Sequence, residues 1–150
     1  MGARRRPKPS TGTPASVDQV YEWLLFLCLN TKGRGLGGSE LLDCPELLAM
    51  RCLATRAAIP NSLTSRAAAI RQLLAERFPI PTDRYRPPEP NLATRHLLGL
   101  SPASERQARP RRRELCADAL GLLLDTSQKH YERTLLWDAA EILWEIEERS

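Results

Sequence analysis

Apolar residues recur at helical spacing along most of this chain, and this pattern constrains the fold more than any other feature. The clearest case is Leu63, Ala67, Ile70 and Leu74, which lie at i, i+4, i+7 and i+11 and so share one helix face. No segment alternates β-branched or aromatic residues with polar ones, as a half-buried strand would. The sequence therefore predicts an all-α protein, a small bundle of about six to seven helices.

Proline and charge divide the chain into four segments. Residues 1–15 are rich in Arg, Pro, Ser and Thr and offer nothing to bury, so we predict a disordered basic tail. Five prolines between positions 79 and 90 predict a semi-rigid linker over residues 79–91. The linker separates an N-terminal helical part, 16–78, from a C-terminal helical part, 92–150, and the sequence leaves open whether the two parts share one core.

Capping residues and helix breakers place the individual helices. Ser16 and Ser62 can each accept a hydrogen bond from the first turn of the helix that follows. Gly99 and Gly121 tolerate the left-handed conformation that commonly ends a helix. The expected helices cover residues 17–29, 45–58, 63–78, 92–98, 111–120, a segment that starts near 125, and 135–148.

The glycine motif, the histidines and the cysteines lack the neighbouring residues or elements that a nucleotide, catalytic or metal site requires. Gly33, Gly35 and Gly38 match G-x-G-x-x-G, but a helix precedes them where a dinucleotide site requires a strand, so we expect a flexible loop. His96 and His130 have no obvious acid partner and are expected at the surface or at the boundary of the core. The four cysteines form no C-x-x-C pair. We predict no catalytic residue, metal site or cofactor, no enzyme activity and no small-molecule substrate.

Charge and hydropathy narrow the class of protein. The net charge is +4, with basic clusters in the tail and over residues 106–113, while the C-terminal end is acidic. Both clusters suit either a solvated surface or contact with nucleic acid or an acidic protein. The apolar run over residues 23–29 is too short to cross a bilayer, so no membrane contact is expected. The cysteine usage favours a reduced, cytoplasmic protein.

The last expected helix carries more apolar surface than a single groove in a small domain usually covers. It has two apolar rows and two tryptophans seven residues apart, and tryptophan is a favoured anchor at protein interfaces. We predict contact with a protein partner or a second copy of the chain, the alternative being that these side chains fill a generous core. The predicted contact residues are Leu136, Trp137, Leu143 and Trp144.

Residues 113–133 resemble a helix-turn-helix. Ala117 stands where two helices must approach closely, and Gly121, four residues later, permits the turn. Ser127 and His130, however, replace the apolar anchors that normally hold the second helix. If DNA is bound, basic and polar residues of this region would meet phosphates or base edges. The implied contacts are Arg111, Arg112, Arg113, Thr126, Gln128, Lys129 and Arg133.

A wider resemblance covers residues 92–146. It rests on the string from Thr94 to Pro102, the Arg-Arg-Glu-Leu and Ala-Leu-Gly segments, Tyr-Glu at 131–132, and Leu-Leu-Trp-Asp at 135–138. This part of the chain is similar to a helical module of uncharacterised actinobacterial proteins. In that family the module accompanies signalling or defence effector domains, which implies work as an adaptor or sensor.

Two functional hypotheses follow. The first is a non-enzymatic helical protein-interaction module with an adaptor or regulatory role, in signalling or defence. The second is a helix-turn-helix transcriptional regulator that binds DNA. Phosphate contacts make affinity fall steeply with salt concentration, so a salt series distinguishes the two hypotheses.

Overall fold

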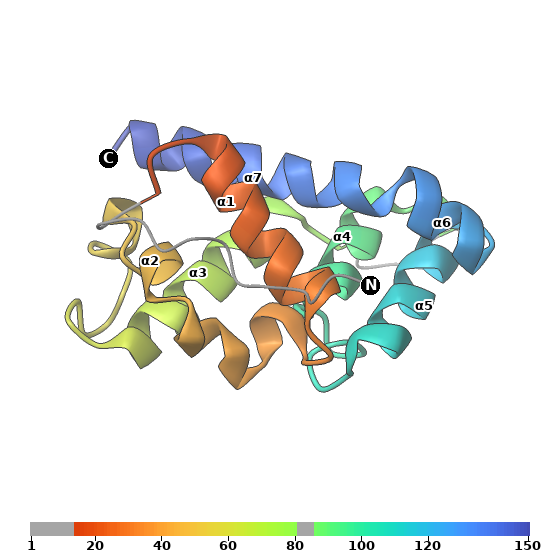
Figure 1. The fold of residues 1–150 in the computed structure, drawn as a ribbon, viewed down its shortest axis with the longest axis horizontal. Coiled ribbons are helices and arrows are strands. Elements are labelled where there is room, and N and C mark those ends of the chain that lie inside the picture. Colours follow the sequence, from red (N-terminus) through yellow and green to blue (C-terminus); the bar gives the residue numbers. More distant parts are fainter. Residues whose placement is uncertain (1–13, 81–85) are drawn as a thin grey trace.

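The computed structural model describes residues 14–80 and 86–150. Over these ranges the chain forms helices and no strands, which confirms the predicted all-α bundle (Figure 1). The predicted tail lies outside the described residues up to position 13, as do positions 81–85 of the predicted linker. The α-helices are α1 (Val17–Leu25), α2 (Pro45–Leu48), α3 (Leu63–Arg77), α4 (Pro90–Leu98), α5 (Arg109–Leu120), α6 (Leu124–His130) and α7 (Glu132–Glu148). The shorter segments are the π turn η1 (Phe26–Asn30) and the 3₁₀ turns η2 (Gly35–Gly37), η3 (Ser39–Asp43) and η4 (Arg51–Leu53).

Two helix starts follow the local chemistry read from the sequence. The Ser16 hydroxyl accepts a hydrogen bond from the Gln19 amide at 3.4 Å, at the start of α1. The Ser62 hydroxyl does the same for the Ser65 amide at 3.2 Å, at the start of α3. Each hydroxyl satisfies one of the amides that a helix start leaves without an intrahelical partner. Both predicted caps are confirmed.

The predicted helix over residues 45–58 is wrong, because a distant side chain interrupts it. The helix α2 ends at Leu48, and Met50 adopts an extended backbone conformation with ψ 137°. The buried Glu147 carboxylate of α7 accepts hydrogen bonds from the amides of Arg51 at 2.9 Å and Cys52 at 2.8 Å. This carboxylate caps the first amides of η4, so the chain starts a new turn there instead of continuing α2.

One hydrophobic core joins the N-terminal and C-terminal helical parts. It contains Leu24 of α1, Ile70 of α3, Leu97 of α4 and Leu143 of α7, all with no exposed surface. The closest helix pairs are α4 with α5 and α1 with α7. The helix α7 runs along the length of the molecule, and α1 lies against it (Figure 1). The two parts on either side of the proline-rich segment are therefore packed as one body.

The Gly-rich connector, residues 30–39, contains 3₁₀ turns held by an arginine where the sequence interpretation expected a flexible loop. Arg71 of α3 donates hydrogen bonds to the carbonyl oxygens of Leu36 at 2.5 Å and Gly38 at 3.2 Å. A Cβ atom on Gly37 would stand 2.6 Å from the carbonyl oxygen of Gly99, so only glycine fits there. The glycines thus allow the backbone of η2 to pack directly against the end of α4.

Candidate functional site

The connection between α5 and α6 forms as the sequence predicts. Gly121 ends α5 in the left-handed conformation, with φ 70°. Its amide donates to the carbonyl oxygen of Asp118, and the Leu122 amide donates to that of Ala117, both at 3.0 Å. These two bonds satisfy carbonyls that a helix end would otherwise leave without partners. Ala117 is buried. The helices α5 and α6, joined by a short turn, lie at the edge of the bundle (Figure 1).

The helix α6 is attached to the bundle through a small contact. Ser127 is its one buried residue and lies beside Cys116 of α5. Burial raises the pKa of the Cys116 thiol to about 12, so this cysteine packs as a neutral, small hydrophobe. The backbone leaves the helix at Tyr131 and enters α7 at Glu132. A short helix with one serine facing inward presents most of its surface outward.

Three large apolar side chains around α6 are exposed to solvent. Leu123 is 79% exposed, Tyr131 44% and Leu124 39%. We call these three residues the α6 patch. The sequence interpretation missed the patch, although a run of three leucines directly after Gly121 was a usable signal, because consecutive apolar residues on a short helix cannot all face one core.

The residues predicted for partner contact on α7 are mostly core residues. Leu136 and Leu143 have no exposed surface, which corrects the prediction that they are available to a partner. The physical reason is that α1 packs along α7 and covers its apolar rows. Trp137 is half-buried and meets Tyr21 of α1 edge to face, with ring centroids 5.2 Å apart. Trp144 is also half-buried and packs against the core.

Two of the arginines predicted to contact nucleic acid are turned inward. Arg112 has no exposed surface and donates to the carbonyl oxygens of Cys28 and Gly33, both at 3.0 Å, and to that of Leu97. Its guanidinium thus joins α4, η1 and the Gly-rich connector. Arg113 binds the buried Glu132 through both Nε and Nη2, with the shortest contact at 2.7 Å. The buried Arg112 is not available for phosphate, which corrects the prediction for this residue, whereas Arg113 is half-buried and held by its ion pair with Glu132.

The remaining predicted nucleic-acid contacts lie at or near the surface. Arg111 is exposed and pairs with Glu114 at 3.3 Å. Lys129 is exposed and pairs with Asp125 one turn earlier, at 3.1 Å. Arg133 is exposed, while Thr126 and Gln128 are half-buried. Carboxylates lie beside two of the exposed cations and partly offset the positive charge around α6.

His96 is buried, which corrects its predicted position at the surface or at the boundary of the core. Its Nδ1 atom lies 2.7 Å from the Ser101 hydroxyl, and that hydroxyl lies 2.5 Å from the Ser104 hydroxyl. All three side chains are at most 6% exposed. Burial, together with the nearby Arg111, lowers the pKa of His96 to about 4. The neutral ring therefore fastens the loop after α4 to that helix.

A metal centre needs a cluster of ligating side chains, and a membrane span needs a long apolar helix. Residues 14–80 and 86–150 contain no cluster of three or more His, Cys, Asp or Glu side chains that could hold a metal ion. None of the helices in these ranges has the length and apolar character needed to cross a membrane. No protein-family model, curated protein or solved structure matches the chain.

Proposed function

We propose that this chain is a helical protein-interaction module that docks through the α6 patch. The observation that carries the proposal is the exposure of Leu123, Leu124 and Tyr131 in and beside a helix that fully buries one residue, Ser127. Clustered apolar side chains at a surface are characteristic of interaction sites. An adaptor or regulatory role agrees with the resemblance of residues 92–146 to helical modules that accompany signalling or defence domains.

The partner we propose is a second copy of the same chain. Ile59 is 62% exposed and Leu63 46%, at the turn that leads into α3. Beside them is a hollow of about 280 Å³ lined largely by apolar side chains, among them Pro45, Leu48 and Leu63. We call this the α3 hollow. The helix α6 and the α2 to α3 region lie at opposite ends of the long axis of the molecule (Figure 1).

The two ends suggest a head-to-tail contact. The α6 patch projects a leucine, whereas the other end is concave, so the α6 patch of one copy fits the α3 hollow of the next better than either fits itself. Such a heterologous contact leaves one donor end and one acceptor end free, and it extends into rings or chains. Three side chains supply much less than the roughly 800 Å² per partner of a standard interface, so we expect weak, reversible association.

Sedimentation velocity over a concentration series tests the association. The natural chain is expected to show a rising average mass, whereas Leu123→Asp and Leu63→Asp are each expected to stay monomeric. Both substitutions suit their positions, because an acidic residue is favourable at or next to a helix N-terminus. Leu42→Asp is a matched control that adds the same charge, since Leu42 is as exposed as Leu124 but lies outside both ends.

Mixing the two monomeric variants tests the head-to-tail arrangement. Leu123→Asp keeps an intact α3 hollow and Leu63→Asp keeps an intact α6 patch, so the mixture is expected to form one-to-one dimers and nothing larger. A natural chain that stays monomeric at every concentration contradicts the proposal. Association that survives both single substitutions contradicts it as well.

DNA binding is the second candidate function, and the α5 to α6 connection is the observation that favours it. Gly121 gives the turn of a helix-turn-helix, and Lys129 and Arg133 are exposed beyond it. Leu123, Leu124 and Asp125, however, occupy the start of α6, where a recognition helix meets base edges. An electrophoretic shift over a salt series tests it. Binding that weakens with salt and with Arg133→Gln would support DNA, and no shift at low salt would exclude it.

A further inference from the structure

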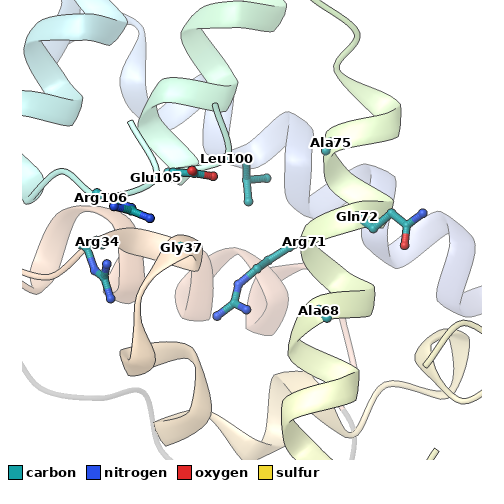
Figure 2. A pocket seen from close by; sticks show the side chains of 10 residues that line it. Arg34, Gly37, Ala68, Arg71, Gln72, Ala75, Leu100, Glu105 and Arg106 are labelled. Atoms are coloured by element: carbon teal, nitrogen blue, oxygen red, sulfur yellow. The ribbon is translucent and has the colours of Figure 1, made fainter. Parts of the chain in front are cut away.

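A second surface feature shares no lining residue with the α6 patch or the α3 hollow. It is a hollow of about 480 Å³ between the Gly-rich connector, one face of α3 and the loop after α4. Arg34, Arg71 and Arg106 line it from these three different segments (Figure 2). A volume of this size falls within the range of small-molecule sites.

The arginines of this hollow carry charge that the protein does not neutralise. Within the described part of the chain, no carboxylate comes within 4.0 Å of the guanidinium of Arg34, Arg71 or Arg106. Burial, and then the like charge of Arg34, lowers the pKa of Arg71. Glu105 also lines the hollow, so its lining carries three positive charges and one negative charge. An anion placed among the guanidinium groups would relieve their mutual repulsion.

The central arginine is held in position before any ligand arrives. Arg71 uses Nε and Nη2 to bind the carbonyl oxygens of Leu36 and Gly38, which leaves Nη1 without a hydrogen bond to the described residues. It extends from α3 toward the side on which Arg34 and Arg106 lie (Figure 2). The close packing of Gly37 on Gly99 fixes the backbone beneath. A guanidinium fixed in this way loses little side-chain entropy when it binds a ligand.

We propose that this hollow binds a small phosphorylated molecule. Planar guanidinium groups match phosphate oxygens with pairs of parallel hydrogen bonds, and three of them line the hollow from separate segments. The Glu105 carboxylate repels a bare phosphate but accepts hydrogen bonds from hydroxyl or amino groups, so it selects a ligand that has an organic part. The sequence interpretation, which expected no small-molecule partner, could not reveal this site, because it brings together residues from three distant segments.

Inorganic pyrophosphate is the probe for the first experiment. At constant ionic strength it is expected to raise the melting temperature of the natural chain, with the shift growing as the logarithm of the pyrophosphate concentration above the dissociation constant, as for any ligand bound only by the folded state. Isothermal titration calorimetry gives the affinity. Arg34→Gln and Arg106→Gln are each expected to weaken binding about tenfold or more, the effect of losing a charge-assisted hydrogen bond. Arg133→Gln removes the same charge from α7 and is expected to leave the affinity unchanged.

Two further variants test the charge balance of the hollow and its independence from self-association. Glu105→Gln is expected to tighten pyrophosphate binding, because it removes the one negative charge of the hollow. Leu123→Asp, which removes the proposed self-association surface, is expected to bind pyrophosphate normally, so the two proposals can fail separately. Non-saturable binding, or an equal loss in Arg133→Gln and Arg34→Gln, would overturn the site. Binding to phosphatidic acid vesicles without binding to pyrophosphate would overturn the small-molecule ligand.

Discussion

The helices α6 and α7 follow each other directly in the chain but have opposite structural roles. The helix α7 is 17 residues long and buries two leucine and alanine rows under α1 and α4, whereas α6 has 7 residues and buries one serine. The longer helix looked like the docking surface from its sequence because it is the more apolar. The comparison teaches that apolar content indicates a docking surface only where no other helix of the chain covers it.

The largest expected difference in stability comes from placing a carboxylate in α7 and, for comparison, at the start of α6. Leu143→Asp puts a carboxylate into a site with no exposed surface and no partner, and we expect no cooperative unfolding transition to remain. Leu123→Asp places the same group at the start of α6, where it can cap the helix, and is expected to change the free energy of unfolding by less than about 0.5 kcal/mol. Circular dichroism with urea titration measures both. Similar losses in the two variants would contradict the division between interior and surface.

A smaller effect is expected from the ion pairs of the two helices. Arg113→Ala leaves the Glu132 carboxylate buried without its partner, and we expect a loss of about 3–5 kcal/mol in the free energy of unfolding. Lys129→Ala breaks the exposed pair with Asp125 on α6, with an expected loss of about 0.5 kcal/mol or less. Equal losses in the two variants would show that water can replace Arg113 as the partner of the Glu132 carboxylate. Urea unfolding at neutral pH is the measurement.

Low pH is expected to reduce the free energy of unfolding, because the buried His96 resists protonation in the folded chain. Because the pKa of His96 is lowered from 6.5 to about 4 in the folded chain, the unfolded chain takes up the proton first. This contribution to stability is complete above about pH 6.5, falls as the pH drops toward 4, and reaches a total loss on the order of 3 kcal/mol. His96→Gln is expected to reduce the dependence of the free energy of unfolding on pH between about 6.5 and 4, whereas Leu123→Ser beside α6 is expected to leave that dependence unchanged. An unchanged slope in His96→Gln would assign the acid sensitivity to other groups.

Local chemistry made part of the fold predictable. The serine caps of α1 and α3 act within three residues, and Gly121 ends α5 through bonds to the preceding turn, so each is written in a short stretch of sequence. The apolar spacing of residues 63–74 likewise predicted α3. These elements depend little on the remainder of the chain, and the sequence interpretation placed them correctly.

Long-range contacts explain what the sequence interpretation missed. The Glu147 carboxylate that ends α2 acts on amides 95 and 96 residues away. Arg112 finds its carbonyl partners 15, 79 and 84 residues away, so an arginine that looked solvent-facing within a basic block is buried. The α6 patch differs, because the leucine run after Gly121 is visible in the sequence and needs no long-range contact to be recognised.

The Glu147 contact also has a consequence for synthesis of the chain. Residues 45–53 take their final backbone path only when the last turns of α7 are present to hold the amides of Arg51 and Cys52. During translation this segment must therefore wait, with Leu47, Leu48 and Leu53 uncovered, until α7 has left the ribosome. We expect nascent chains stopped before α7 to be the species that chaperones and proteases recognise first.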